Sequence, residues 1–241
     1  DGPGEDGSWI FTDVSIQSGT DVKMDGMALA VGDYDLDGFL DMFVTNIGDN
    51  VLLRNSGSGL AFTDVATETG TAVGVLSGED RVSWGAVFFD YDNDTDEDLY
   101  IVSGYLPPRA LEVQPNVLLR NDRDGAFTDV SFGSGADNRD YGRGGVYLDF
   151  DRDGCLDLYV LNYGQAARLY RNLCDWGNNW LVIDPEGSAG NRDGIGARIT
   201  VVTGGEAQIR EVRGGSSQMG QSTMPPHFGL GTAAVADLVV V

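Results

Sequence analysis

Twelve aspartates recur in three loops with one spacing, and their carboxylates are the groups in this chain best suited to chemistry. Each loop has aspartate at its positions one, three, five and nine. The twelve residues are Asp33, Asp35, Asp37, Asp41, Asp90, Asp92, Asp94, Asp98, Asp149, Asp151, Asp153 and Asp157. Alternating carboxylates on a tight turn, with a backbone carbonyl near position seven, form the oxygen shell that Ca²⁺ prefers. The spacing therefore predicts a metal site in each loop and about three Ca²⁺ ions in total.

Position six of these loops distinguishes the second from the other two. Gly38 and Gly154 occupy it in the first and third loops, where a sharp turn needs positive φ. The second loop has Thr95 there and adds Asp96 and Glu97, so it binds with altered geometry or is the weakest site. Mg²⁺ fits such irregular loops less well, and neither a helix–loop–helix pattern nor a glutamate at position twelve supports an EF-hand. Solvated acidic turns are the plain alternative.

The segments around the loops must position these carboxylates, and they repeat at intervals of roughly 58 residues. A short apolar stretch precedes each loop, and a β-branched or aromatic stretch follows it, as in buried strands. A tail ends at Asn55, Asn121 and Asn172, and the motif Phe-Thr-Asp-Val begins at Phe11, Phe62 and Phe127. Four short strands in each repeat are typical of a propeller blade, and no helix of ordinary length is expected.

These motifs resemble those of a known repeat family. The loop pattern, with its Phe-Thr-Asp-Val and Arg-Asn flanks over roughly residues 9–174, is similar to the FG-GAP, or VCBS, repeat of integrin-type propellers. The resemblance implies Ca²⁺ in each loop, an extracellular setting and an adhesive or scaffolding role. Propellers of this family commonly close with about seven blades, and three cannot readily close a ring. Either the three blades form an open array or partner chains cover its edges.

From Asn178 onward the aspartate period stops and short alternating strands with glycine turns begin. This segment resembles the ASPIC/UnbV domain. The matching residues are Asn191, Arg192, Gly194, Gly196, Ala197, Arg210 to Val212 and His227 to Gly231. We expect an all-β fold with three blades in residues 1–176 and a small β-domain in residues 177–241. His227 lies in a turn with no nucleophile motif nearby, which favours a structural role. The strand-like end from Val235 to Val241 is expected to complete its own sheet, and addition to the sheet edge of another chain is the alternative.

Cys155 and Cys174 are the only cysteines, and the hairpin between them turns near Gly164. Antiparallel register then places the two roughly opposite each other, where a disulfide is feasible, although two separate buried thiols are the alternative. A disulfide together with weak calcium sites indicates an oxidising, extracellular compartment. The sequence does not begin with Met and shows no signal peptide, so a processed chain or a fragment is expected.

The overall charge excludes several classes of function. With 38 acidic and 15 basic side chains, the formal net charge is −23, and more than a third of the acids lie in the three loops. A nucleic-acid backbone binder needs a basic face, and anionic membrane surfaces attract basic segments. No apolar run is long enough to span a bilayer, and a single histidine leaves little room for histidine catalysis.

The leading hypothesis is an extracellular, calcium-binding, non-catalytic adhesion or scaffold module. Its partner is a protein or a glycan, and the best candidate contact loop is the longer connection from Gly104 to Gln114, which carries Tyr105 and Arg109. The second hypothesis is a structural subunit that binds copies of itself and polymerises into a fibre or surface layer. A glycan-acting enzyme is the third, because paired carboxylates can hydrolyse glycosides.

Overall fold

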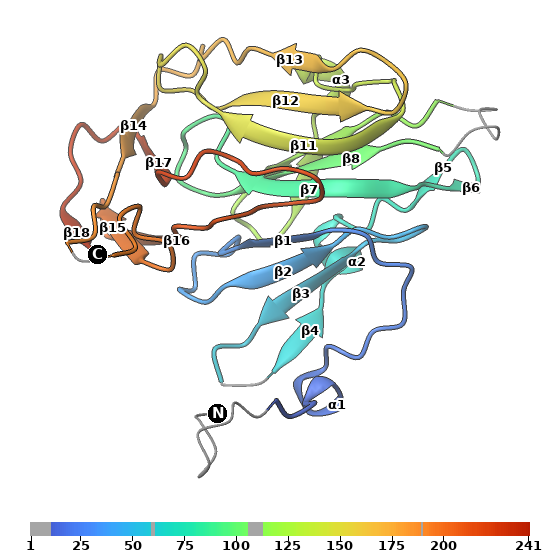
Figure 1. Ribbon diagram of the computed structural model, residues 1–241, viewed down its shortest axis with the longest axis horizontal. Helices are drawn as coiled ribbons and strands as arrows, with labels where there is room; N and C mark the ends of the chain where they lie inside the picture. Colours follow the sequence, from blue (N-terminus) through green and yellow to red (C-terminus); the bar gives the residue numbers. More distant parts are fainter. Residues whose placement is uncertain (1–10, 59–60, 106–112, 189) are drawn as a thin grey trace.

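The computed structural model describes residues 11–58, 61–105, 113–188 and 190–241. Short antiparallel sheets dominate it and stack on one another, which confirms the predicted all-β class (Figure 1). The described helices have four residues each: α1 (Ser15–Ser18), α2 (Ala66–Thr69) and α3 (Ser131–Ser134). None of these helices is long or apolar enough to cross a lipid bilayer.

The first two blades are four-stranded antiparallel sheets. Their strands are β1 (Leu29–Gly32), β2 (Asp41–Val44), β3 (Val51–Asn55) and β4 (Phe62–Asp64), then β7 (Ser83–Phe89), β8 (Asp98–Ser103), β9 (Val117–Asn121) and β10 (Phe127–Asp129). The third blade has three strands in the described residues: β11 (Gly142–Leu148), β12 (Asp157–Asn162) and β13 (Arg168–Tyr170). Each aspartate loop joins the first two strands of its blade, so the predicted order of strand, loop and strand is confirmed.

The Phe-Thr-Asp-Val motif has a structural role that its position before each loop did not indicate. Its copies at residues 62–65 and 127–130 provide the fourth strands β4 and β10, which pair with β3 and β9. The motif therefore completes the blade that precedes it in the chain. A one-turn helix and a glycine in the left-handed region follow each copy: Gly19, Gly70 and Gly135.

The blades pack face to face through alternating side chains, as the period of two in a strand requires. Phe43 and Leu52 of the first blade contact one face of the second, in a core that also contains Leu99. Tyr100, the next residue along β8, points the other way into a second core with Val160 of the third blade. The middle blade is thus buried on both faces, and the outer two are not.

The C-terminal part forms two further sheets, shown in orange and red in Figure 1. The first pairs β14 (Asn179–Val182) with β17 (His227–Gly231), and the second has the order β16 (Glu206–Glu211), β15 (Arg198–Thr203), β18 (Leu238–Val240). Because β18 pairs with β15, the expectation that the last residues complete their own sheet is confirmed. A separate hairpin contains β5 (Val75–Leu76) and β6 (Glu79–Asp80).

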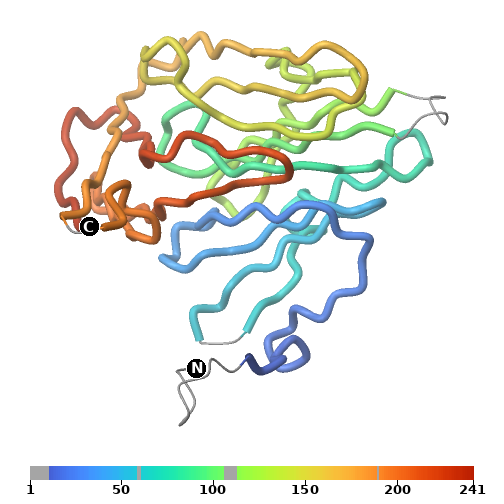
Figure 2. Tube along the Cα trace, in the orientation of Figure 1, coloured from blue at the N-terminus to red at the C-terminus, as the bar shows by residue number. Residues whose placement is uncertain are grey.

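The C-terminal part is fastened to all three blades. The long connection between β16 and β17 runs back across β7 and β11 (Figure 2). There Ser217 Oγ accepts the Ala86 N–H at 3.1 Å, and Ser222 Oγ accepts the Tyr147 N–H at 3.2 Å. Arg213 donates to the carbonyl oxygen of Val31 in the first blade at 2.5 Å. A single chain of contacts therefore joins the C-terminal sheets to the blades and their loops.

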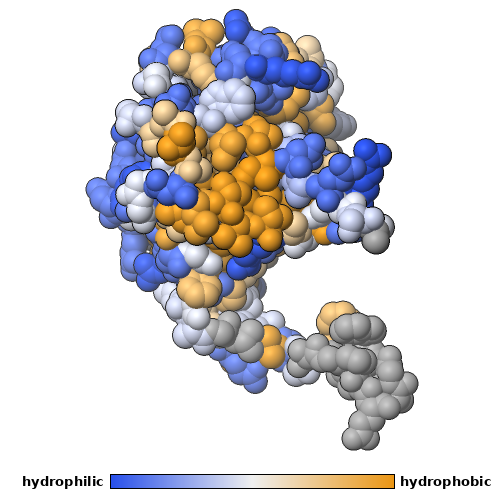
Figure 3. Space-filling model, turned by 90° about the vertical axis from the view of Figure 1, so that its left-hand side faces the viewer, coloured by the Kyte–Doolittle hydropathy of each residue, from blue (hydrophilic) through white to orange (hydrophobic). Residues whose placement is uncertain are grey.

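One side of the C-terminal part is apolar and open to solvent, as the space-filling view shows (Figure 3). The exposed apolar residues of this part include those of β18 and its flanks: Val235, Leu238, Val239, Val240 and Val241. We call these five residues the C-terminal apolar patch. Contiguous apolar surface of this kind is a common mark of an interaction site.

Candidate metal centres

Each aspartate loop brings three carboxylates together, with one oxygen of each within 4.8 Å of the others. In the first two loops the residues at positions one, three and five form the group, and in the third loop those at positions one, three and nine do. The three groups are Asp33, Asp35 and Asp37; Asp90, Asp92 and Asp94; and Asp149, Asp151 and Asp157. Nine of the twelve predicted residues therefore meet in clusters of hard oxygen ligands, the donor set that suits Ca²⁺.

Several oxygens in these loops are buried without a hydrogen-bond donor among the described residues. They include Oδ1 of Asp33 in the first loop and Oδ1 of Asp92 in the second. A buried polar atom without a partner is costly, and a buried charge is more so. A cation between the carboxylates would supply the missing partner, so the residues present fit a bound Ca²⁺.

The turn geometry of the loops agrees with the sequence pattern. At position six, φ is +86° in Gly38, +98° in Thr95 and +91° in Gly154. In every loop this residue donates its N–H to the position-one carboxylate, over 3.2 Å to Asp33, 3.0 Å to Asp90 and 3.0 Å to Asp149. The second loop thus makes the same turn as the others, but with a β-branched residue in a conformation that favours glycine.

The position-nine aspartates have a structural role that the sequence reading missed. One oxygen of each accepts the N–H of the asparagine that ends the blade's tail: 2.7 Å from Asn55 to Asp41, 2.9 Å from Asn121 to Asp98, and 2.8 Å from Asn172 to Asp157. The other oxygen accepts the N–H of the residue at position two, as in the 3.0 Å bond from Tyr91 to Asp98. These carboxylates fasten the loop to the third strand. The Arg-Asn pair that ends all three tails is the sequence signal from which this role could have been predicted.

Burial raises the pKa of several of the loop carboxyls, mostly in the first two loops. It raises the pKa of Asp33 to about 7, with Glu97 adding to the shift, and the pKa of Asp41 to about 8. It also raises the pKa of Asp92 to about 6, with the charge of Asp94 second. Desolvation penalises the charged form, and neighbouring carboxylates repel one another. A cation in the loop would oppose both effects.

The two extra acids of the second loop hold neighbouring parts of the chain together. Asp96 pairs with Arg123 at 2.9 Å. Glu97 is buried, pairs with Arg210 of β16 at 3.2 Å, and accepts the N–H of Asp33 at 2.9 Å. Glu97 therefore joins the first blade, the second blade and the C-terminal sheets. The spacing of the second loop, which predicts altered geometry or a weak site there, does not by itself predict these contacts of Asp96 and Glu97.

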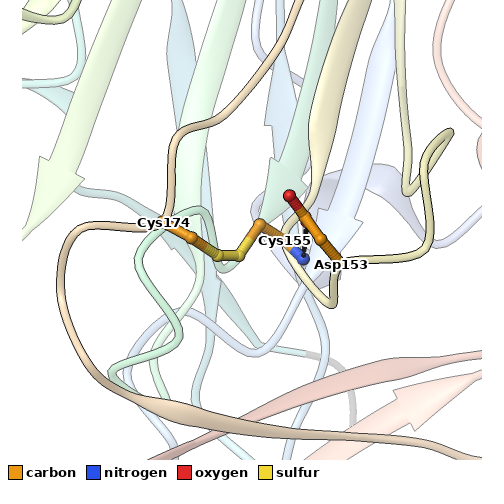
Figure 4. A group of neighbouring side chains, drawn as sticks. All are labelled: Asp153, Cys155 and Cys174. Carbon is orange, nitrogen blue, oxygen red and sulfur yellow. Dashed lines mark hydrogen bonds between the residues drawn. A yellow bond between two sulfur atoms is a disulfide. The ribbon is translucent and has the colours of Figure 1, made fainter.

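The third loop is held by the predicted disulfide. Cys155 and Cys174 are bonded, with their Cα atoms 6.0 Å apart, and Asp153 accepts the Cys155 N–H at 3.1 Å (Figure 4). Cys155 precedes β12 and Cys174 follows β13, and the antiparallel register of these strands, continued past their ends, places the two cysteines within one residue of opposite positions. Their sulfurs are oxidised and are not metal ligands here. Asp153 instead pairs with Arg171 at 3.2 Å.

His227 is a structural residue, as expected. It is buried in β17, its Nε2 lies 3.0 Å from the carbonyl oxygen of Gly154, and its ring stacks on Trp180 of β14. Burial lowers the pKa of this imidazole, so it is neutral at physiological pH. His227 and Trp180 together hold the C-terminal sheets against the third loop.

The candidate partner loop is described only at its ends. Tyr105 donates its hydroxyl to the carbonyl oxygen of Asp80 at 3.2 Å, and its own carbonyl accepts from Arg143 at 3.0 Å. Arg109 lies outside the described residues. The role predicted for this loop in partner binding stays a prediction.

Comparisons with known proteins agree with the resemblance seen in the motifs. The family model of the FG-GAP-like repeat matches residues 33–101, and the model described as ASPIC and UnbV matches residues 187–241. Cartilage acidic protein 1 of Xenopus tropicalis is 27% identical over 244 residues, which are 97% of this chain and 36% of that protein. The proteins of the same name from Mus musculus and Homo sapiens are 26% identical over 243 residues, again 97% of this chain, and 36% and 35% of those proteins.

The chain spans roughly a third of the length of these curated relatives. The two family matches lie in the blades and in the C-terminal sheets respectively. The chain therefore carries an FG-GAP-like repeat and an ASPIC and UnbV segment, and over nearly all of its length it is similar to cartilage acidic protein 1.

Proposed function

We propose that this chain is an extracellular, calcium-binding, non-catalytic adhesion or scaffold module in which about three Ca²⁺ ions stabilise the blades. The observation that carries the proposal is the gathering of three carboxylates within 4.8 Å in each of three loops. The partnerless buried oxygens of the first two loops support it further.

The proposed ligands are the loop aspartates. In all three loops the carboxylates at positions one and three form part of the cluster. Position five completes the cluster in the first two loops, and position nine completes it in the third. Asp41 and Asp98 act on the ion indirectly, because each holds its loop against the third strand of its blade.

Ion binding to these loops would stabilise the folded chain directly. Each loop joins two neighbouring core strands, β1 to β2, β7 to β8 and β11 to β12, so its geometry exists only in the folded state. A ligand that binds only the folded state at a hundred times its Kd adds about 2.7 kcal/mol. Sites with Kd of about 10⁻⁴ to 10⁻³ M are typical of extracellular modules. The disulfide between Cys155 and Cys174 fits the same compartment.

The absence of catalysis belongs to the same proposal. The loop carboxylates are assigned to ions and His227 to packing, which leaves the connections between strands for recognition. A protein or glycan partner would then bind these connections, with Tyr105 and Arg109 as candidate contacts. The similarity to a protein named cartilage acidic protein 1 supports a matrix or cell-surface setting.

Calcium titration of the chelator-treated chain tests the proposal. We expect about three bound ions by calorimetry and a melting temperature that rises with Ca²⁺. Asp35→Asn, Asp92→Asn and Asp151→Asn, each at position three, should each remove one ion. Asp21→Asn is the matched control, because Asp21 is exposed and lies outside the loops. An unchanged melting temperature after chelation would refute calcium binding in these loops.

The second candidate function is a structural subunit that assembles with copies of itself. In the described residues the third blade has three strands where the others have four, so the edge of β13 is unpaired. Unpaired sheet edges bind further strands readily. Light scattering of the purified chain over a wide concentration range tests this function, and a monomer throughout would refute it.

A further inference from the structure

We propose that copies of this chain assemble head to tail, with residues 11–14 of one copy forming the fourth strand of the third blade of the next copy. The inference rests on the second candidate function, self-assembly, and specifies its surfaces. It does not depend on whether the loops bind calcium.

The donor segment repeats a sequence that the structure twice shows as an edge strand. Residues 11–14, 62–65 and 127–130 are all Phe-Thr-Asp-Val. The second copy pairs with β3, Phe62 opposite Asn55, and the third pairs with β9, Phe127 opposite Asn121. Residues 11–13 pair with no strand in the described part of the chain, and Phe11 is 97% exposed, against 8% for Phe127.

Within the described residues, the acceptor edge belongs to the blade that lacks such a strand. Blades one and two have the orders β1-β2-β3-β4 and β10-β9-β8-β7, whereas the third has β11-β12-β13 among the described residues. The tail of the third blade, Arg168 to Asn172, matches the tails that bind the motif in the other two. By the same register, Phe11 of a second copy would lie opposite Asn172, and Thr12 opposite Arg171.

The glycines after the helices are independent evidence for the fourth strand that the third blade lacks in the part of the chain that the structure describes. A Cβ built on Gly19 would lie 2.6 Å from the carbonyl oxygen of Phe62, and one on Gly70 would lie 3.3 Å from that of Phe127. Helices α1 and α2 therefore end against the edge strand of the blade that follows them in the chain. A Cβ on Gly135 meets nothing within 4 Å. The corresponding place beside Gly135 is open, and in the proposed assembly the carbonyl of Phe11 from a second copy would occupy it.

The asparagines that end the tails are a third feature in which one blade differs from the other two. The Asn121 side chain donates to the carbonyl oxygen of Tyr34 in the preceding blade at 2.7 Å, and that of Asn172 donates to Tyr91 at 2.6 Å. The side chain of Asn55, in the first blade, donates within its own blade, to Leu40 at 3.2 Å. With a second copy stacked on the third blade, Asn55 of that copy would face the carbonyl of Phe150, which occupies the position of Tyr34 and Tyr91.

The outer face of the third blade is apolar and uncovered. The same three positions in the second blade lie beneath the third blade and are buried: Tyr100 (0% exposed), Val102 (1%) and Leu118 (3%). Their counterparts in the third blade are exposed: Tyr159 (39%), Leu161 (40%) and Leu169 (49%). Figure 1 places β13 and α1, which directly follows residues 11–14, at opposite ends of the molecule, so these residues do not reach β13 of their own copy. Such a head-to-tail contact is heterologous and builds a ring or a filament.

A complementation experiment on the full chain tests the inference by light scattering after size exclusion. Phe11→Asp disables the donor and Leu169→Asp disables the acceptor, and both side chains are exposed, so the fold is retained. Each variant alone should lose association. An equimolar mixture should form a complex of two chains and no larger species, because one intact donor and one intact acceptor remain. Val75→Asp, also at an exposed apolar residue, should associate like the natural chain.

Two results would overturn the inference. A natural chain that stays monomeric at every concentration would remove self-assembly altogether. Association that persists in both variants would refute strand donation but not self-assembly, which would then occur through another surface. In that case Val239→Asp, in the C-terminal apolar patch, should abolish the association. The register has its own test: Thr12→Cys in one copy and Arg171→Cys in another should crosslink on oxidation, whereas Thr12→Cys with Arg168→Cys should not.

Discussion

Replacing Gly154 by alanine should destabilise the chain several times more than the same replacement at Gly38. Both glycines occupy position six of a loop, with φ of +91° and +86°. An L-residue in this left-handed region costs roughly 1–2 kcal/mol. Alanine recovers about 0.4–1 kcal/mol by restricting the unfolded chain. The backbone contribution is therefore the same at both positions, and about 1 kcal/mol is expected at Gly38.

The difference between the two losses of stability comes from the side chains that lie beside each loop. A Cβ on Gly38 meets nothing within 4 Å, whereas one on Gly154 would lie 1.7 Å from Nε1 of Trp180. The indole would have to move, but it stacks on His227, which in turn contacts the Gly154 carbonyl at 3.0 Å. Forcing extra volume into packed side chains typically costs about 1–3 kcal/mol. We therefore expect a loss of about 2–4 kcal/mol for Gly154→Ala.

Urea unfolding with saturating Ca²⁺, followed by circular dichroism, measures both losses under conditions where all loops are occupied. The control is the same pair of replacements in a Trp180→Ala background. There the indole is gone, and Gly154→Ala should cost no more than Gly38→Ala. Equal losses at the two glycines in the natural background would refute the inferred packing of the C-terminal sheets on the third loop.

Three further predictions follow from the strained, buried and titrating groups. Thr95→Gly should raise the free energy of unfolding by about 1 kcal/mol in the same assay, because threonine at φ +98° stores about 1–3 kcal/mol of strain; a loss would show that no strain exists there. Arg210→Met should cost about 3–5 kcal/mol by leaving Glu97 buried and unpaired, whereas replacing both by Met should restore most of it; equal losses would contradict this pairing. In the folded, chelator-treated chain the pKa of Asp33 is raised to about 7 and that of Asp41 to about 8, from the ordinary value of 3.8 that holds in the unfolded chain. The folded state therefore binds these protons more tightly, and the stability that this gives is complete below pH 3.8 and is lost as the pH rises through the two raised pKa values. The melting temperature of the calcium-free chain should therefore fall between about pH 5 and pH 8, and saturating Ca²⁺ should remove that fall; a rise over this range would contradict the role of burial.

Much of the fold and of the candidate site follows from local spacing. A repeat at a constant interval, with small and apolar residues before each loop and aromatic or β-branched residues after it, predicts strand, turn and strand. The glycines at position six predict the positive φ of the turn, and Thr95 adopts it as well because its neighbours impose the same bonds to Asp90. The disulfide followed from hairpin register, since pairing along two strands extends to residues just beyond them.

Other features depend on which segments meet in space. The assignment of Asp96 and Glu97 to neighbouring parts, rather than to the second metal cluster, needs the positions of Arg123 and Arg210, which are distant in the chain. The Phe-Thr-Asp-Val motif likewise lies close in the chain to two blades, the one before it and the one after it. Spacing alone does not decide with which of the two it pairs.

The sequence by itself determined the three carboxylate loops, the strands on either side of them and the disulfide, because each depends on spacing within one turn or one hairpin. Only the tertiary structure decided which carboxylates cluster, which are taken up by backbone N–H groups, and which edge and face of the third blade stay uncovered. Those properties depend on burial and on contacts between residues far apart in the chain, which local patterns do not encode.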